Sequence, residues 1–378
     1  MKVYLDHGAA TPVDPRVVEA MFPYFTEEFG NPSSLHRYGR TAREAVERSR
    51  AAVSESINAA PEEVVFTSGG SESDNLALRG IAYGLKGKGR HIITSSIEHP
   101  AVLETCRSLE VDGFKVSYLG VDGEGFVDAG ELEAAITGET ILVSIMHANN
   151  EIGTIQDIEA LGGVCSKHGV AFHTDAVQSY TKTPVDVQMQ NLSLASFSAH
   201  KIHGPKGVGA LYVRGDLKPK VVKQVTGGHH EFDLRAGTEN VAGIVGFAKA
   251  LSLADESRVE YMRGLRDRLT EGLLRIPDAV LNGPTGDRRL CNNVNVTFNG
   301  ILGDEMLLEL DMMGIAVSTG SACGSGDPGP SHVLAAIGRS PVDAQGTVRL
   351  TLGWENTREE IAYAIDSVGE VVAKLRGG

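Results

Sequence analysis

The sequence predicts an α/β protein in which helices cover both faces of a mostly parallel central sheet, with a smaller α+β domain after it. Two observations support this fold class. Short apolar runs typical of buried strands alternate with helical patterns as far as about Val241, and the regular alternation then ends. The length of 378 residues also exceeds what one hydrophobic core usually holds, so two domains are expected.

The first part of the chain supplies the elements of the central sheet. Short, largely apolar runs bounded by polar or glycine-containing segments indicate strands that are buried on both faces, as in a parallel sheet. Helical periodicity fills the intervals between them. The expected strands are residues 63–66, 91–94, 141–145, 170–173 and 208–213, and the expected helices include residues 73–83, 101–109 and 158–167.

A long helical pattern with few helix breakers, residues 244–274, is interpreted as the connector between domains. A large domain is therefore predicted at residues 15–255, and a small domain at residues 1–14 together with 256–378. The small domain is expected to contain a strand at 292–298, a helix at 304–313, a glycine-rich loop at 318–331, a strand at 347–352 and a closing helix at 358–375.

Composition narrows the classes of partner and the location. The 35 basic and 49 acidic residues give a net charge of −14, which disfavours nucleic acid as a ligand, and no apolar run approaches a bilayer span. The first residues lack the apolar core of a signal peptide, so a cytoplasmic protein is expected. The four cysteines lack CxxC spacing, which argues against a disulfide framework or a structural zinc site.

The first chemical signal is the segment 66–75, where a strand passes through Gly69, Gly70 and Ser71 into a helix. Glycines let the backbone approach a ligand closely, and a helix start offers free N–H groups and a partial positive charge to a phosphate. The alternative is that Ser71 and Asp74 form a capping box on a helix that binds nothing. From this segment alone the two interpretations are equally supported.

The second signal pairs a carboxylate with an amine. Asp175 ends an apolar strand, at the edge where open α/β sheets bind ligands, although such a residue often only caps a following helix. Lys201 follows one strand later and is expected beside it. A lysine, a carboxylate and a phosphate-binding helix start are together what pyridoxal 5′-phosphate (PLP) requires: a Schiff-base partner, a counter-ion for the ring nitrogen and an anchor.

The third signal is a single cysteine, Cys323, in the Gly/Ser/Pro-rich segment 318–331. A thiol that must reach a buried substrate and later a partner needs a loop of this kind, and exposure favours reactivity. The other three cysteines fall in helices or at a strand start. Cys106, Cys165 and Cys291 are therefore expected to be small apolar packing residues.

Several segments in this order and spacing resemble the NifS/IscS-like cysteine desulfurases, PLP enzymes of aminotransferase fold type I in the class-V aminotransferase family. The resemblance covers nearly the whole chain and includes Ser198-Ala199-His200-Lys201 and Gly320-Ser321-Ala322-Cys323. It implies the PLP fold type I. The remaining matching segments are residues 4–6, 10–12, 29–34, 67–75, 98–99, 149–153, 175–178 and 235–238.

The resemblance implies a role for individual residues. Lys201 is the Schiff-base lysine, Asp175 pairs with the pyridine nitrogen, Gln178 bonds the ring hydroxyl, and His99 stacks on the ring and has a catalytic role. Asn150 and Arg349 hold the substrate carboxylate, and Asn150 is also expected at the cofactor. The cofactor phosphate is bound by Gly70, Ser71, Ser198 and His200, and by Thr238 of a neighbouring subunit.

The implied activity is conversion of L-cysteine to L-alanine through a persulfide on Cys323. The implied assembly is a homodimer with shared active sites that donates sulfur to a protein acceptor such as an iron–sulfur scaffold. The alternatives are a selenocysteine lyase, another PLP-dependent C–S lyase or an aminotransferase, or a non-catalytic sulfur-assembly platform. His229 and His230 stand where the family usually has other residues, but adjacent histidines point apart, and no metal site is expected.

Overall fold

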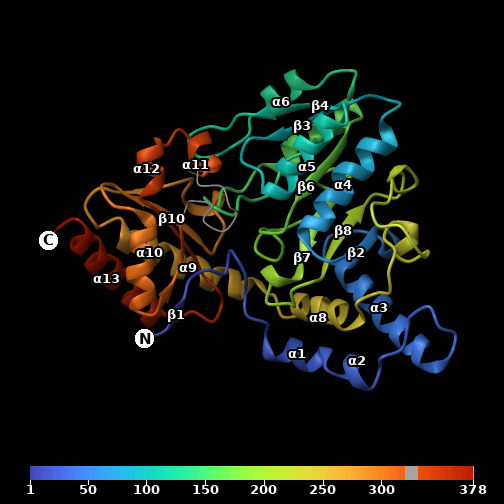
Figure 1. The fold of residues 1–378 in the computed structure, drawn as a ribbon, viewed down its shortest axis with the longest axis horizontal. Coiled ribbons are helices and arrows are strands. Elements are labelled where there is room, and N and C mark those ends of the chain that lie inside the picture. Colours follow the sequence, from blue (N-terminus) through green and yellow to red (C-terminus); the bar gives the residue numbers. More distant parts are fainter. Residues whose placement is uncertain (320–330, 378) are drawn as a thin grey trace.

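The computed structural model describes residues 1–319 and 331–377. Its larger sheet has seven strands in the order β2-β8-β7-β6-β5-β3-β4 (Figure 1). Neighbouring strands are parallel except where β8 pairs with β2 and β7. The fold-class prediction of a mostly parallel central sheet is confirmed. The strands are β2 (Val64–Thr67), β3 (His91–Ser95), β4 (Lys115–Leu119), β5 (Thr140–Ser144), β6 (Ala171–Asp175), β7 (Leu194–Ser198) and β8 (Gly209–Val213).

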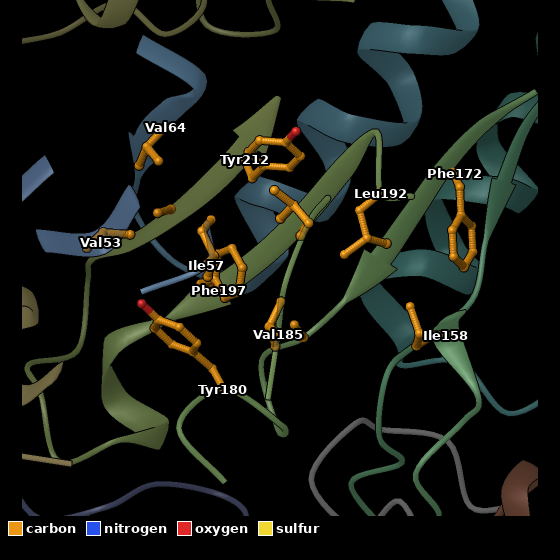
Figure 2. Close-up of a cluster of buried hydrophobic side chains, with 14 of the residues drawn as sticks. Val53, Ile57, Val64, Ile158, Phe172, Tyr180, Val185, Leu192, Phe197 and Tyr212 are labelled. Atoms are coloured by element: carbon orange, nitrogen blue, oxygen red, sulfur yellow. The ribbon is translucent and has the colours of Figure 1, made fainter. Parts of the chain in front are cut away.

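Helices cover both faces of this sheet because its central strands are apolar on both sides. Val65 and Leu211 face a core shared with α4 and α5, whereas Phe66 and Tyr212, one residue further along each strand, face a second core. Figure 2 shows part of that second core, which includes Ile57, Phe172 and Tyr212. The helices are α1 (Pro15–Met21), α2 (Pro23–Thr26), α3 (Arg37–Glu55), α4 (Gly70–Leu85), α5 (Pro100–Val111), α6 (Ala129–Ala135), α7 (Ile158–His168) and α8 (Val241–Ser252).

The rest of the chain forms a second lobe around its own core (Figure 1). An antiparallel sheet has the order β12-β13-β10-β9, and β1 pairs in parallel with β11. No helix among the described residues has both the length and the apolar character of a membrane span. The elements are β1 (Val3–Tyr4), α9 (Glu256–Leu273), β9 (Ala279–Leu281), β10 (Asn293–Phe298), α10 (Gly303–Met312), β11 (Ile315–Ala316), β12 (Ser318–Thr319), α11 (His332–Ala336), α12 (Pro341–Gln345), β13 (Thr347–Thr351) and α13 (Arg358–Leu375).

The predicted continuous helix at residues 244–274 is wrong, because the chain breaks it into α8 and α9. The carboxylate of Asp255 accepts a hydrogen bond from the backbone N–H of Arg258 at 2.9 Å and starts the second helix. Side chains of α8 pack in the core of the larger sheet, and those of α9 pack in the core of the second lobe. The division into domains at residues 14/15 and 255/256 stays a prediction.

Short 3-10 helices complete the fold, and one of them positions a lysine. They are η1 (Pro61–Glu63), η2 (Ala199–Lys201), η3 (Lys218–Lys220), η4 (Glu231–Asp233) and η5 (Gly286–Arg288). Because η2 follows β7 directly, Lys201 lies just beyond the carboxyl end of a central strand. The carboxyl ends of parallel strands are where ligands bind in sheets of this type.

Candidate active site

A cavity of about 340 Å3 lies at the carboxyl edge of the large sheet. Its wall combines residues from distant parts of the chain, including the N-terminal segment, three strand ends and β13 of the second lobe. Most of the residues predicted at the site meet here. The lining consists of Gly8, Ala9, Gly70, Ser71, Asp74, His99, Met146, Asn150, Asp175, Val177, Gln178, His200, Lys201 and Arg349.

The start of α4 presents uncapped backbone amides to this cavity. Gly69 is the N-cap with φ of +149°, a conformation that favours glycine, and no side chain caps the helix. The alternative capping box of Ser71 and Asp74 is therefore wrong. A Cβ on Gly70 would lie 2.6 Å from a methyl carbon of Val177, so the turn packs too closely for a larger residue. The arrangement is typical of a phosphate-binding helix start.

Ser198 and His200 extend this anion site from the end of β7. The Ser198 hydroxyl and Nδ1 of His200 are hydrogen-bonded at 2.7 Å. A Cβ on Gly69 would lie 3.8 Å from the Ser198 Oγ, which places this hydroxyl next to the turn before α4. Burial and the nearby Lys201 lower the pKa of His200 to about 4, so its ring is neutral near pH 7.

Asp175 and His99 occupy the middle of the cavity. The Asp175 carboxylate is buried and accepts one hydrogen bond, 2.9 Å from the backbone N–H of Val177, and no helix follows it. Burial raises the pKa of Asp175, whereas His99, that N–H and Lys201 oppose the rise. His99 is the N-cap of α5, and its Nδ1 accepts from the backbone N–H of Ala101 at 3.1 Å. The proton of the neutral ring is consequently on Nε2.

Among the residues that the structure describes, the amine of Lys201 contacts backbone oxygens and no carboxylate. Its Nζ donates to the carbonyls of Gly8 and Ala9, the latter at 2.7 Å. Burial lowers the pKa of Lys201 to about 7, and the positive charges of Arg349 and Lys182 contribute. A lysine in this state is partly neutral near pH 7 and can act as a nucleophile or as a base.

Arg349 and Asn150 also line the cavity. One terminal nitrogen of Arg349 bonds the Asp6 carboxylate at 3.0 Å, and the other donates to the backbone carbonyl of Asn150 at 3.3 Å. The Nε of Arg349 is buried and has no hydrogen-bond partner among the described residues. Gln178, also in the lining, donates to the Gly8 carbonyl at 2.9 Å. A guanidinium with an open donor is suited to a carboxylate ligand.

Sequence reasoning missed a group of buried acids behind Asp175. Glu98 accepts from the Ser95 hydroxyl at 2.6 Å, and burial raises its pKa to about 8. The pKa of Asp74 is also raised, first by burial and then by the charge of Asp175. Glu98 is therefore mostly protonated near neutral pH, and the raised pKa of Asp74 disfavours a second charge beside Asp175. Their positions next to Gly70 and His99 in the sequence were the available signal.

One predicted site residue lies away from the cavity, and another cannot be placed. Thr238 is exposed and does not line the cavity. Cys323 lies outside the described residues. His229 is exposed and bonds Asp233 at 2.9 Å, whereas His230 accepts from the backbone N–H of Gly237 at 3.2 Å. The three other cysteines, Cys106, Cys165 and Cys291, are free and buried, as predicted.

The sequence profile of the aminotransferase class-V family matches residues 3–363. The chain belongs to this family. It is similar to the cysteine desulfurase IscS of Clostridium botulinum, with 50% identity over 99% of this chain and 95% of that protein. The IscS of Methanosarcina thermophila is 51% identical over 99% of this chain and 93% of its own length.

Solved structures agree with this membership. A NifS-like protein superposes with a TM-score of 0.93 at 40% identity, covering 99% of this chain and all of the other. A structure of SspA in complex with cysteine has a TM-score of 0.84 at 39% identity and covers 94% of this chain and all of SspA. The predicted NifS/IscS-like family is confirmed.

Enzymes of this family depend on PLP, and three features of the cavity fit that cofactor. The start of α4 has amides without a side-chain cap, next to the Ser198 hydroxyl. Asp175 is a buried carboxylate in the cavity wall with one hydrogen bond from the protein backbone. The Lys201 amine is held by carbonyl oxygens alone. A phosphate, a ring nitrogen and an aldehyde are the matching groups.

Proposed function

We propose that the chain is a PLP-dependent cysteine desulfurase that converts L-cysteine to L-alanine and keeps the sulfur as a persulfide on Cys323. The single observation that carries this proposal is the meeting of Lys201, Asp175 and the uncapped start of α4 in one cavity with Arg349. The names of the IscS relatives, at about half identity over nearly the full length, support the same activity.

Residues around the cavity would hold PLP as follows. The amides of Gly70 and Ser71, with Ser198 and His200, would bind its phosphate, and Asp175 would pair with its ring nitrogen. Lys201 would bond covalently to its aldehyde carbon. Gln178 is assigned to the ring hydroxyl and His99 to the ring face. When bound, PLP withdraws electrons from the α-carbon of the amino acid attached to it.

The substrate carboxylate is assigned to Arg349 and Asn150. Asp6 holds one terminal nitrogen of the guanidinium, so the group is pre-oriented with its buried Nε still available. Lys201, with a pKa near 7, takes the α-proton once its amine is free. Because Nδ1 of His99 is occupied by the backbone of α5, His99 exchanges protons through Nε2.

Cys323 receives the sulfur. Its thiolate attacks the sulfur of the substrate, a bond forms between the two sulfurs, and the bond from sulfur to the substrate β-carbon breaks. The electron pair of that bond stays with the β-carbon, which takes up a proton on the way to alanine. The described residues that flank this segment contact the surroundings of the cavity: Ser318 pairs with the lining residue Arg349, and His332 contacts, at 2.9 Å, the backbone of Glu98, which precedes the lining residue His99.

Labelled cysteine tests the activity. Protein loaded with PLP is incubated with cysteine carrying labelled sulfur, and both alanine and protein-bound label are measured. The wild type and a Cys106→Ser control are expected to form alanine and retain label, whereas Cys323→Ser retains none and Lys201→Ala makes no alanine. If Cys323→Ser keeps wild-type alanine output, a C–S lyase replaces the desulfurase. If neither the wild type nor any variant makes alanine, a non-catalytic platform is favoured.

The assembly is proposed to be a cytoplasmic homodimer that passes sulfur to a protein acceptor such as an iron–sulfur scaffold. Thr238 is exposed in the single chain, which is consistent with a contact to the phosphate site of a neighbouring subunit. Light scattering at low micromolar concentration is expected to give twice the mass of one chain, and Thr238→Val is expected to weaken PLP retention. An active monomer contradicts the shared site.

A further inference from the structure

Two histidines and a glutamate meet outside the cavity, on three segments that are far apart in sequence. His7 follows β1, His203 follows η2, and Glu355 follows β13. One ligand atom from each residue can be chosen so that all three lie within 4.8 Å of one another. Nδ1 of His7 lies 3.8 Å from one oxygen of Glu355, and Nε2 of His203 lies 3.7 Å from the other.

His7 is buried without the usual compensation for its polar atoms. The residue is 3% exposed, and neither ring nitrogen has a hydrogen-bond partner of ordinary length and angle among the described residues. Buried polar atoms are normally paired, so the open Nδ1 of His7, which faces the Glu355 carboxylate, points to a missing ligand. Gly353 leaves room there, because a Cβ at this position would lie 2.4 Å from the His7 ring and 2.5 Å from the Glu355 carboxylate.

His203 is held in place by its backbone and by an aromatic neighbour. Its φ is +63°, an uncommon value for a residue with a side chain, and its N–H donates to the Thr11 hydroxyl at 2.8 Å. The ring stacks on Trp354 with centroids 3.9 Å apart. Strained backbone and locked rings concentrate at binding sites, where they orient a ligand in advance.

We propose that His7, His203 and Glu355 bind a divalent transition-metal ion of the zinc type. Two imidazoles and one carboxylate form a three-ligand set that zinc accepts, with a fourth position left for water. Tetrahedral zinc needs ligand atoms about 3.3 Å apart, given metal–ligand distances of about 2.0 Å. The separations of 3.7 and 3.8 Å run to the two different oxygens of Glu355, and the three ligand atoms lie within 4.8 Å of one another, so the widest separation would have to close by at most about 1.5 Å. The Glu355 side chain is 40% exposed, which leaves access from solvent.

Binding there would tie together the segments that build the cavity. His7 precedes Gly8, whose carbonyl accepts from Lys201, and His203 follows Lys201 by two residues. Glu355 continues the strand that carries Arg349. A metal ion at this position therefore acts as a clamp beside the candidate active site. The inference does not depend on which reaction the cavity performs.

Metal binding is tested on the PLP-loaded protein after treatment with a chelator. Equilibrium dialysis against micromolar Zn2+ is expected to give one tightly bound ion per chain, and Co2+ is expected to give the visible bands of a tetrahedral site. His203→Phe keeps the stacking on Trp354 but removes a ligand, and we expect at least a tenfold loss of affinity. Glu355→Gln, at a partly exposed position, is expected to weaken binding in the same direction.

Two controls distinguish this site from other metal-binding groups. His229→Phe removes an exposed histidine elsewhere, and Cys323→Ser removes a thiol that could bind zinc; both are expected to bind as the wild type does. Zn2+ is also expected to raise the melting temperature of the wild type but not that of His203→Phe. The proposal is overturned if no tight ion binds, if either control loses it, or if both His203→Phe and Glu355→Gln bind normally.

Discussion

The lowered pKa of Lys201 predicts when the protein without cofactor reacts with PLP. The perturbations are a change of pH and the substitution Arg349→Gln. Burial and the charges of Arg349 and Lys182 lower the pKa of this amine from 10.5 to about 7. Only the neutral amine attacks an aldehyde, so the rate of covalent attachment should rise with pH and level off above about 7.

The magnitude follows from the two pKa values. At about pH 7.5, an amine with a pKa of 7 is neutral in roughly three quarters of the molecules, and one with a pKa of 10.5 in about one in a thousand. The buried lysine therefore has roughly 700 times more reactive amine than an exposed one. Removing the positive charge of Arg349 favours the protonated form, so the inflection in Arg349→Gln should move to higher pH.

The assay is stopped-flow absorbance of PLP mixed with the cofactor-free protein between about pH 6 and 10. Nα-acetyl-lysine serves as the matched amine, because its rate should keep rising towards pH 10 and because it shares the titrations that belong to PLP itself. The reasoning is refuted if the protein follows the free amine, or if Arg349→Gln moves the inflection to lower pH.

Two further predictions concern buried acids. The buried Glu231 carboxylate accepts two hydrogen bonds from the buried Arg50 guanidinium, at 2.7 and 2.8 Å. Glu231→Leu should therefore lower the free energy of unfolding, measured in urea, by about 3–5 kcal/mol. Glu47→Ala, which removes an exposed partner of the same arginine, should lower it by less than about 1 kcal/mol. Equal losses would contradict this assignment. Glu98 has a pKa of about 8 in the folded protein and about 4.5 in the unfolded chain, so between these pH values it must take up a proton on folding, which lowers stability as the pH rises. Glu98→Gln should therefore be more stable than the wild type at pH 7, by at most roughly 3 kcal/mol. This gain should vanish near pH 4, where the carboxyl is protonated in both states. A gain that is independent of pH would contradict it.

The sequence predicted those features that depend on local pattern. Val65 and Phe66 are adjacent apolar residues that face different cores, which is why short continuous apolar runs indicated a sheet covered on both faces. Asp175 and Lys201 could be paired because each follows a strand of a parallel sheet, and such strand ends meet at one edge. The break at Asp255 was missed because a capping aspartate interrupts a helix without any glycine or proline.

Contacts between residues that are far apart in the sequence could not be predicted from the local sequence pattern. No local signal shows that the carbonyls of Gly8 and Ala9 receive the Lys201 amine, about 190 residues away, because this contact depends on how the N-terminal segment crosses the sheet. The raised pKa values of Glu98 and Asp74 likewise became visible only once the burial of these two residues was known.

The parallel pairing of β1 with β11 has a consequence for biosynthesis. Val3 pairs with Ile315, and Asp6 bridges to Thr351, so the segment from Val3 to Asp6 finds its partners only after residues 315–351 have been synthesised. Gly8 and Ala9, whose carbonyls accept hydrogen bonds from the Lys201 amine, follow directly after this segment and therefore stay without its anchoring contacts until then. The large sheet can fold as it emerges, but the pocket is complete only after the strand bearing Arg349 has been made. Capture of the cofactor by the complete pocket therefore follows the synthesis of residue 349, and a chain interrupted before that residue would carry Lys201 without the arginine that helps to lower its pKa.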